Sequence, residues 1–404
     1  MRVDKKRLMI LGASILQLPA IQKAKEMGLT VIAVDIDEQA IGFKEADICL
    51  PISTIDTEKV LEAAKKYEID GIMTLASDMP MRVIAKVSKE MDLVGINEAT
   101  ALKTTNKIIM RQALLKNKVP IPYFYKASNE SEFLEAVEYI KHKECRCIVK
   151  AADNSGSRGV DLLRDFKKTT LKKAYKYCKQ YSRSGDVIVE EYMEGPEVSV
   201  ETLSIDGECR VIQITDKLTT GAPYFVEIGH SQPSELDIKI KKKIEAVAIL
   251  ANKAVGITNG PSHTEIIVTK EGPKVVELGA RLGGDNITTH LVPLSTGIDM
   301  VECCIQIALG ERPNYEAKLE KASAIRYIKS NEGIINSIFG VNNARKMEGI
   351  QQVSIVHDVG YQMKSIKSSA DRLGFVIAQG DTIKDAINFC ENALKIIKVG
   401  IEDS

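Results

Sequence analysis

Short apolar runs alternate with amphipathic stretches over the first hundred residues of the chain. The runs RLMILGA, TVIAVDI and DGIMTLA have the length of strands, and the stretches Thr57 to Tyr67 and Met81 to Met91 have the apolar spacing of helices. Strands that alternate with helices form a parallel sheet covered by helices. The pattern therefore predicts an N-terminal α/β domain of Rossmann-like architecture.

The pattern then changes to a linker helix and a small α/β unit. A helix over 104–118 is expected to end at Val119-Pro-Ile-Pro122, because proline stops a helix. After it, the strand-like runs YFYKAS, CRCIVK and GVDLL are interleaved with helical stretches at Ser131 to Lys141 and Lys167 to Tyr181. We expect this unit to be a separate subdomain.

Two hairpins and a long helix are predicted for the second half of the chain. Asp206-Gly207 is a type I′ turn signal between two strands, and residues 214–235 are expected to form a polar loop. A helix over Leu236 to Val255 and a second hairpin over 263–279 follow. Thr382 is placed to cap a helix in a final small α/β piece. The pattern divides the chain into four parts: residues 1–106, 107–188, 189–320 and 321–404.

Charge and cysteine content exclude several classes of protein. Lys plus Arg and Asp plus Glu number 55 each, so the chain has no general attraction for nucleic acid or an acidic membrane surface. Its eight cysteines include no Cys-x-x-Cys pair, which is typical of reduced cysteines in a cytoplasmic protein. We therefore expect small molecules as the partners.

The first residues imitate a signal peptide, because basic MRVDKK precedes apolar LMILGASIL. The strand-like run TVIAVDID that follows favours a βαβ start instead. No apolar run approaches the ~20 residues that span a bilayer. We expect a cytoplasmic protein with no membrane segment.

The first strand-to-helix turn, Gly12-Ala13-Ser14, raises the possibility of a dinucleotide site. Asp35 ends the second strand, and an acidic residue at that place is typical of nicotinamide-dependent enzymes. The second and third glycines of the fingerprint would fall on Ser14 and Gln17, so the pattern is incomplete. An oxidoreductase is therefore a weak alternative.

The hairpin HTEIIVTKEGPKVVELGARLGG is predicted to place two glutamates side by side. A three-residue loop, Lys270-Glu271-Gly272, makes Glu265 the cross-strand partner of Glu277, with Gly272 at the position that favours positive φ. Directly opposite side chains share one face of the sheet, with Cβ atoms roughly 5 Å apart. Both strands are apolar on both faces, which predicts a largely buried hairpin.

Two neighbouring carboxylates in a buried sheet repel each other unless a proton or a cation lies between them. Oxygen ligands favour Mg²⁺. Arg281 follows in a glycine-rich turn, where a guanidinium can stabilise negative charge on a reacting phosphate or carbonyl. The alternative is a half-exposed hairpin with two solvated glutamates.

The loop AADNSGSRGV follows a strand that ends at Lys150. The lysine offers an ammonium to a phosphate, and backbone N–H groups from Asn154 to Gly159 offer further donors. Glycines at 156 and 159 let the backbone approach a ligand closely. Alone, such a loop is more often an ordinary surface turn.

The segment VIVEEYMEGPE favours a nucleotide as the ligand of that loop. A strand that ends in Glu190-Glu191-Tyr192-Met193 offers an acceptor for an adenine amino group and apolar contacts for the ring. Glu197 is placed to bind ribose hydroxyls. The alternative is a buried strand edge with ordinary surface acids.

Taken in order, these motifs resemble the ATP-grasp superfamily of carboxylate–amine and carboxylate–thiol ligases. The resemblance rests on Lys107 in TTNKIIMRQALLKNKVPIP, Lys150 before its loop, EEYMEGPE, and Glu265 with Glu277 and Arg281. It implies an N-terminal α/β domain, a lid, and a metal-binding subdomain, with ATP between the lid and that subdomain. It also implies phosphorylation of a carboxylate by ATP, followed by attack of an amine on the acyl phosphate.

The resemblance, which covers roughly residues 1–310, implies a role for each candidate. Arg281 would stabilise the acyl phosphate and the tetrahedral species. The metal ligands for Mg²⁺ or Mn²⁺ would be Glu265 and Glu277. The ATP contacts would be Lys107, Lys150, Ser155, Gly156 and Ser157 at the phosphates, and Glu190, Glu191, Tyr192, Met193 and Glu197 at adenosine.

Departures from the family pattern narrow the choice among subfamilies. Many members carry Glu-x-Asn-x-Arg at the second metal ligand, whereas this chain has ELGAR, with Gly279 at the Asn position. The turn ARLGG and the run EIGHSQPS resemble the L-amino acid ligases that form dipeptides. By that resemblance Glu227 and His230 contact the substrate or the acyl phosphate. Asp78, at the end of the DGIMTLASD strand, is a further candidate to face the substrate.

The sequence leaves three functions open. The leading one is an ATP- and Mg²⁺-dependent ligase that joins a small carboxylate, an amino acid, to an amine. The alternatives are a purine-biosynthetic ligase of the phosphoribosylglycinamide synthetase type and an ATP-binding protein that has lost catalysis, which only the missing Asn supports. Relatives that form dimers make a homodimer a further expectation.

Overall fold

The computed structural model describes residues 5–154, 156 and 158–402. A four-stranded parallel sheet with the order β3-β2-β1-β4 forms the N-terminal domain, as the alternating pattern predicts. Its strands are β1 (Arg7–Leu11), β2 (Thr30–Asp35), β3 (Ile48–Pro51) and β4 (Gly71–Met73), and its helices are α1 (Leu18–Glu26), η1 (Ile41–Lys44), α2 (Thr57–Lys66) and α3 (Met81–Glu90).

The helix predicted over 104–118 is wrong in its extent, because Asn106 interrupts it. The structure has α4 (Glu98–Thr105) and α5 (Lys107–Lys116) in this region. Asn106 has extended backbone, and its side chain accepts hydrogen bonds from the backbone N–H groups of Ile108 and Ile109. This cap begins a new helix and places Lys107 at its first position, where its N–H donates to the carbonyl of Ala152.

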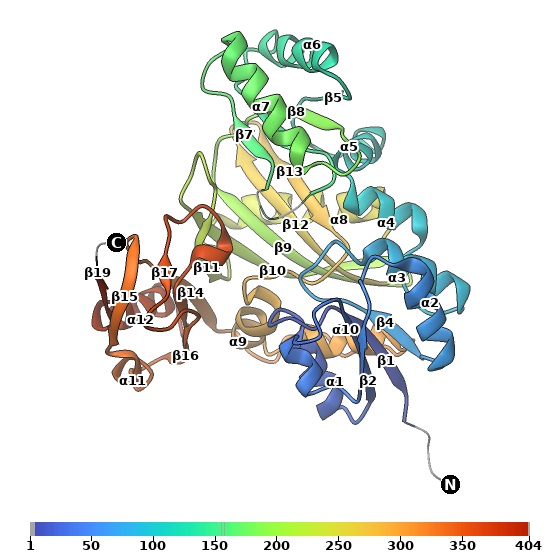
Figure 1. Ribbon diagram of the computed structural model, residues 1–404, viewed down its shortest axis with the longest axis vertical. Helices are drawn as coiled ribbons and strands as arrows, with labels where there is room; N and C mark the ends of the chain where they lie inside the picture. Colours follow the sequence, from blue (N-terminus) through green and yellow to red (C-terminus); the bar gives the residue numbers. More distant parts are fainter. Residues whose placement is uncertain (1–4, 155, 157, 403–404) are drawn as a thin grey trace.

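The lid is a four-stranded sheet with the order β5-β8-β6-β7, covered by two helices. Figure 1 shows it at the top of the molecule. Its elements are β5 (Phe124–Ala127), α6 (Glu130–Lys141), β6 (Cys147–Ala151), β7 (Val160–Leu162), α7 (Lys168–Tyr181) and β8 (Val187–Glu191). The predicted boundary at residue 188 falls inside β8, whose pairing with β5 and β6 holds it in the lid.

An eight-stranded sheet with the order β13-β12-β9-β10-β11-β14-β18-β16 forms the centre of the molecule. Asp206 and Gly207, both with positive φ, join β9 to β10 as the turn signal predicts. The polar loop expected over 214–235 is wrong, because most of it pairs as β10 and β11. The strands are β9 (Glu197–Ile205), β10 (Glu208–Thr219), β11 (Glu227–Gln232), β12 (Gly260–Thr269), β13 (Gly272–Gly279), β14 (Ala322–Ile328), β16 (Ile350–Ile355) and β18 (Gly374–Gly380).

The C-terminal region is less separate than the sequence pattern indicates, because β14 pairs with β11 and extends the central sheet. A second, three-stranded sheet has the order β17-β15-β19. Thr382 caps the long C-terminal helix, as predicted, and forms a capping box with Asp385. The remaining elements are α8 (Ile238–Val255), η2 (Ile287–Leu291), α9 (Val292–Thr296), α10 (Met300–Ala308), β15 (Gly333–Phe339), α11 (Val341–Ala344), β17 (Gln362–Met363), η3 (Ser369–Asp371), α12 (Ile383–Ile396) and β19 (Lys398–Glu402).

Helices after the central hairpin attach this sheet to the N-terminal domain. Leu291, Met300 and Ile305 share one buried apolar cluster with Leu8 and Ile21 of the N-terminal domain. No single helix in the described part of the chain is long and apolar enough to cross a bilayer, and only the bent pair Ile287–Thr296 and Met300–Ala308 reaches that length and apolar content together.

Candidate active site

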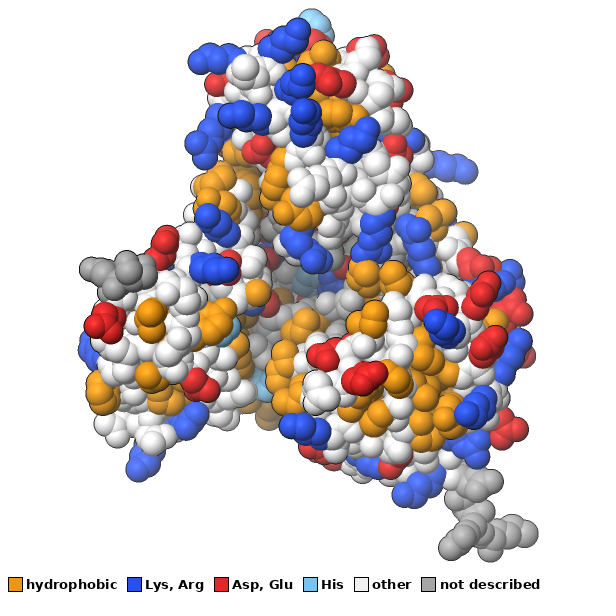
Figure 2. Space-filling model, in the orientation of Figure 1, with side chains coloured by type: hydrophobic (Ala, Val, Ile, Leu, Met, Phe, Trp, Pro, Cys, Tyr) orange, Lys and Arg blue, Asp and Glu red, His pale blue; other side chains and the backbone are white. Residues whose placement is uncertain are grey.

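The N-terminal domain, the central sheet, the lid and the C-terminal region border one cavity of about 590 Å³. Figure 2 shows the molecular surface hollowed where these parts meet. Gly12 and Asp35 line the cavity from the carboxyl edge of the parallel sheet, which is where open α/β sheets bind ligands. Gly156 lines it from the lid, and Ser369 lines it from the C-terminal region.

The hairpin β12–β13 pairs Glu265 with Glu277, as the sequence predicts, but its turn is shorter than expected and one strand contains a bulge. The turn has two residues, because β12 ends at Thr269 and β13 begins at Gly272, whose φ is +123°. A bulge then leaves Val276 without a partner and restores the predicted register. The two carboxylate side chains are 25% and 32% exposed, so this part of the hairpin is less buried than expected.

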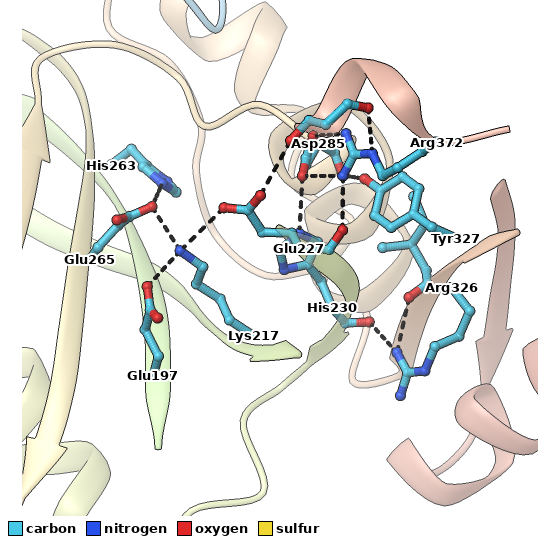
Figure 3. Close-up of polar contacts among 12 residues, drawn as sticks. Glu197, Lys217, Glu227, His230, His263, Glu265, Asp285, Arg326, Tyr327 and Arg372 are labelled. Atoms are coloured by element: carbon cyan, nitrogen blue, oxygen red, sulfur yellow. Dashed lines mark hydrogen bonds and ion pairs between the residues drawn. The ribbon is translucent and has the colours of Figure 1, made fainter. Parts of the chain in front are cut away.

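Glu265 contacts a buried lysine that the sequence pattern did not single out. Lys217, on β10, is 4% exposed, and its Nζ lies 2.7 Å from Glu197, 2.8 Å from Glu265 and 3.7 Å from Glu227 (Figure 3). Burial lowers the pKa of Lys217, but the charges of the three carboxylates outweigh it and hold that pKa well above its ordinary value. We call these four residues the open cluster, since the carboxylates are 22–25% exposed.

His263 supports the same glutamate from two residues away, on the same face of β12. Its Nδ1 lies 2.5 Å from Glu201, and its Nε2 lies 3.6 Å from Glu265. Burial lowers the pKa of His263, but the carboxylate of Glu201 outweighs this effect and raises the pKa to about 9. The imidazole is therefore a second cation beside Glu265 at neutral pH.

Glu277 contacts a different lysine. Lys107 Nζ donates to Glu277 Oε1 at 2.7 Å and to the carbonyl oxygen of Asn154 at 2.6 Å. No group of three His, Cys, Asp or Glu side chains in the described chain is arranged to hold a metal ion. Two half-buried carboxylates suit Mg²⁺, which keeps waters and takes its remaining ligands from a phosphate.

Glu190 belongs to a second cluster, which is closed to solvent. This carboxylate is 1% exposed; Arg111 Nε donates to its Oε1 at 2.5 Å, and Lys150 Nζ lies 2.7 Å from its Oε2. Burial raises the pKa of Glu190, but the charges of Arg111 and Lys150 outweigh it and lower the pKa to about 2. Each oxygen of Glu190 already has a cationic partner, and its expected contact with an adenine amino group stays a prediction. We call these three residues the sealed cluster.

Arg111 is the member of the sealed cluster that the sequence pattern did not single out. Its Nη1 and Nη2 donate to the carbonyls of Val275 and Val276 at 3.0 and 2.7 Å. These carbonyls belong to the bulge that precedes Glu277. One buried guanidinium thus joins α5, the lid strand β8 and the hairpin strand β13. Its signal in the sequence was a charged residue among the apolar positions of MRQALL.

The other residues expected at adenosine lie close together on the same strand and just after it. Glu191 contacts Lys274 at 3.2 Å and accepts from the backbone N–H of Tyr123. The Tyr192 ring lies 4.8 Å from the guanidinium of Arg146, and Met193 is buried. Glu197 belongs to the open cluster. Ser155 and Ser157 lie outside the described residues.

Arg281 faces the cavity from the turn after β13, as expected. Its Nε and Nη2 donate to the two carboxylate oxygens of Asp78 at 2.9 and 3.3 Å. Burial lowers the pKa of Arg281, but the charge of Asp78 outweighs it and raises that pKa above its ordinary value. Asp78, which was expected to face a substrate, therefore contacts this guanidinium first.

Glu227 and His230 line the cavity from β11 and are linked to the C-terminal region. His230 Nε2 lies 3.4 Å from Asp285, and Asp285 accepts hydrogen bonds from Arg372 at 2.8 and 2.7 Å (Figure 3). Ser369 Oγ donates to Glu227. Neither Asp285 nor Arg372 carried a local signal in the sequence. Arg372 lies in the C-terminal segment, which was expected to form a separate piece.

The backbone N–H groups of the first strand-to-helix turn donate to acceptors within the protein. The N–H of Gly12 donates to Val34 O, and the N–H of Ala13 donates to the Asp35 carboxylate at 2.7 Å. The N–H of Ser14 donates to the side chain of Gln17. A pyrophosphate would find these groups occupied, which counts against a dinucleotide site.

Comparison with known proteins identifies two domains in the chain. Residues 143–289 match the ATP-grasp domain family. Residues 326–402 match L-amino acid ligase C-terminal domain 2.

Three relatives illustrate the similarity. The phosphoribosylamine–glycine ligase of Methanocaldococcus jannaschii is 27% identical over 373 residues, which cover 85% of this chain and 82% of that protein. The alanine–anticapsin ligase of Bacillus subtilis is 28% identical over 273 residues, which cover 62% of this chain and 56% of that protein. A crystal structure of L-amino acid ligase from Bacillus licheniformis superimposes with a TM-score of 0.85 at 22% identity, and the match covers 99% of both chains.

The chain thus contains an ATP-grasp domain, and its C-terminal domain is of the L-amino acid ligase type. The predicted superfamily and the predicted α/β fold are confirmed.

Proposed function

We propose that the protein is an ATP- and Mg²⁺-dependent ligase that activates an amino acid carboxylate as an acyl phosphate and joins it to an amine. The observation that carries this proposal is the cross-strand pair of Glu265 and Glu277: Glu265 lines the cavity with Arg281, and Glu277 lines a second pocket with Lys107. Carboxylates that bind a cation and a guanidinium that binds an anion are the groups that phosphoryl transfer requires.

Glu265 and Glu277 would hold Mg²⁺, which on binding neutralises charge on the transferring phosphoryl group. The acidic surplus of the open cluster supports this assignment, because three carboxylates there share the ammonium of Lys217. Lys107, at the N-terminus of α5, is placed to bind a phosphate, with Lys150 of the sealed cluster nearby on β6. Glu190, Glu191, Tyr192, Met193 and Glu197 remain the candidates for adenosine.

In the first step, a carboxylate oxygen of the amino acid attacks the γ-phosphorus of ATP, and the bond to the bridging oxygen breaks to release ADP. Arg281 is placed to compensate the negative charge of the resulting acyl phosphate. His230 and Glu227 lie on the same cavity wall and would orient the amino acid.

In the second step, the amine nitrogen attacks the acyl carbon, and phosphate leaves as the C–N bond forms. The amine loses one proton in this step, and the departing phosphate is one acceptor for it. Gly156 of the lid lines the cavity, so closure of the lid over it would exclude water from the acyl phosphate.

One alternative is the purine-biosynthetic reaction, which the 27% identical phosphoribosylamine–glycine ligase favours. Two observations favour an amino acid ligase over it. The C-terminal region matches the L-amino acid ligase domain. Among the described residues, the N-terminal domain lines the cavity with no Lys or Arg side chain. Its polar side chains there are those of Ser14, Gln17, Asp35, Ser53, Thr54, Ser77 and Asp78. This wall therefore offers no cation to a sugar phosphate.

Phosphate release and product mass test the proposal. The protein is incubated with ATP, Mg²⁺ and pooled amino acids, and we expect phosphate release that depends on the amino acids, together with a dipeptide mass. Release only with phosphoribosylamine and glycine would assign the purine reaction. Tight ATP binding without turnover under both conditions would indicate a protein that has lost catalysis.

A further inference from the structure

Asp78 and Gly279 pack against each other, although they lie far apart in the sequence. Gly279 is the last residue of β13, and a Cβ built on it would lie 2.6 Å from Asp78 Oδ1 and 3.2 Å from Arg281 Nε. Real Cβ atoms essentially never approach another heavy atom to less than 3.0 Å. The space that any other side chain at position 279 would need is therefore occupied by the Asp78 carboxylate.

The segment that carries Asp78 is fixed from several sides. Leu75 forms an isolated parallel bridge with Leu282, so the loop after β4 pairs directly with the ARLGG turn. Gln17 Nε2 donates to the carbonyl of Leu75 at 2.6 Å, and the N–H of Met81 donates to the carbonyl of Asp78. These contacts fix the backbone of the segment relative to the central sheet, and the two hydrogen bonds from Arg281 orient the Asp78 carboxylate.

Arg281 keeps donors for a ligand after these contacts are made. A guanidinium has five N–H groups. Two of them go to Asp78, and one on Nη1 goes to the carbonyl of Leu282 at 3.2 Å. The contacts between described residues thus leave one N–H on each terminal nitrogen, and the side chain is 16% exposed toward the cavity.

We propose that Asp78 is a positioning residue that fixes the orientation of the Arg281 guanidinium in the cavity, and that glycine at 279 is required because it leaves room for the Asp78 carboxylate. The N-terminal domain thereby sets the direction in which the remaining N–H groups of Arg281 point. This assignment rests on the proposed function for its catalytic consequence, whereas the packing of Asp78 against Gly279 stands independently of it.

A double-mutant cycle of Asp78→Ala and Gly279→Ala tests the proposal. We expect Asp78→Ala to lower kcat about 100-fold, with little change in the KM for ATP, because Lys107 and Lys150 are untouched. Gly279→Ala is expected to lower kcat by a similar factor, because its methyl group displaces the carboxylate. In the double variant the second substitution adds little, since the clashing group is already absent. Asp78→Asn, which keeps one acceptor oxygen, is expected to retain more activity than Asp78→Ala.

Thermal unfolding provides the readout that does not depend on the substrate. Gly279→Ala is expected to lower Tm by about 2–4 °C in the wild-type background and by clearly less in the Asp78→Ala background. Asp92 is an exposed acidic residue of the same domain, so Asp92→Asn serves as the control. This variant is expected to leave Tm and kcat unchanged.

Additive losses of Tm in the cycle would overturn the packing of Asp78 against Gly279, whatever the substrate. A wild-type kcat in Asp78→Ala, measured where the wild type releases phosphate, would overturn the positioning role alone. Absence of amino-acid-dependent phosphate release in the wild type would overturn the proposed function, and the Tm cycle would still decide the packing.

Discussion

The sealed and open clusters combine the same kinds of side chain in opposite proportions. In the sealed cluster two cations, Arg111 and Lys150, share the carboxylate of Glu190, which is 1% exposed. In the open cluster three carboxylates share the ammonium of Lys217, and those carboxylates are 22–25% exposed. The first arrangement has a cationic surplus, which keeps its buried carboxylate charged, and the second has an acidic surplus, which suits a divalent cation.

Solvent access separates the two clusters further. A buried ion pair costs much free energy when one partner is removed, because the other partner keeps an uncompensated charge away from water. Carboxylates that reach solvent can exchange partners at much lower cost. We therefore expect substitutions in the sealed cluster to change mainly stability, and substitutions of Glu265 and Glu277, the proposed metal ligands, to change mainly activity.

The largest effect is expected for Glu190→Gln. This change removes the only negative charge between Arg111 and Lys150, and it should lower the free energy of unfolding by about 3–5 kcal/mol. Urea denaturation followed by circular dichroism measures the change. Glu194→Gln, an exposed glutamate three residues beyond β8, is the control and should change stability by less than about 0.5 kcal/mol. Equal stability of the Glu190 and Glu194 variants would contradict the difference between sealed and exposed carboxylates.

Glu277→Gln is expected to act on turnover rather than on stability. The amide keeps the volume of the side chain but loses the charge that a divalent cation requires. We expect phosphate release to fall at least about 100-fold, a loss of roughly 3 kcal/mol in transition-state stabilisation. The half-exposed ion pair with Lys107 should cost only about 1 kcal/mol of stability. Retained turnover would remove Glu277 from the mechanism.

A smaller effect is expected from the titration of His263. Its pKa in the folded protein, about 9, lies above the ordinary value of 6.5, so the charged imidazole stabilises the fold fully below pH 6.5. That contribution, at most about 3 kcal/mol, is lost as the pH rises through 9. The difference in unfolding free energy between the wild type and His263→Gln should therefore shrink between pH 7 and pH 10. A constant difference over that range would mean that His263 is neutral in the folded protein.

Local patterns predicted most of the elements and the pairing of the two glutamates, even where the detail was wrong. The pairing of Glu265 with Glu277 was correct although the loop is one residue shorter than expected, because the bulge at Val276 compensates for the difference. Periodicity fixes which face a side chain lies on, and the helix caps depend on only a few neighbouring residues. The cap at Asn106 is equally local but was missed inside a continuous helical pattern, whereas the extent of β8 depends on its pairing with the distant strands β5 and β6.

Long-range pairings explain what the sequence could not predict. Lys217 lies in a stretch that was expected to be a polar loop, because DKLTT has the composition of a turn and its partners come from three other strands. Arg111 and Arg372 each contact residues more than 70 positions away. Polar residues in the middle of a buried sheet contradict local propensity, and functional sites are where such contradictions are expected.

The continuity of the central sheet through β11 and β14 has a practical consequence for dissecting the protein. The four backbone pairings from Gly229–Arg326 to Gln232–Ser323 bind the C-terminal region to the strand that carries His230. A chain shortened before β14 would leave β11 as a bare edge with unpaired N–H and C=O groups, and such edges recruit strands from other molecules. The L-amino acid ligase C-terminal domain is thus not a detachable appendage, and engineered chimaeras should exchange it together with β11.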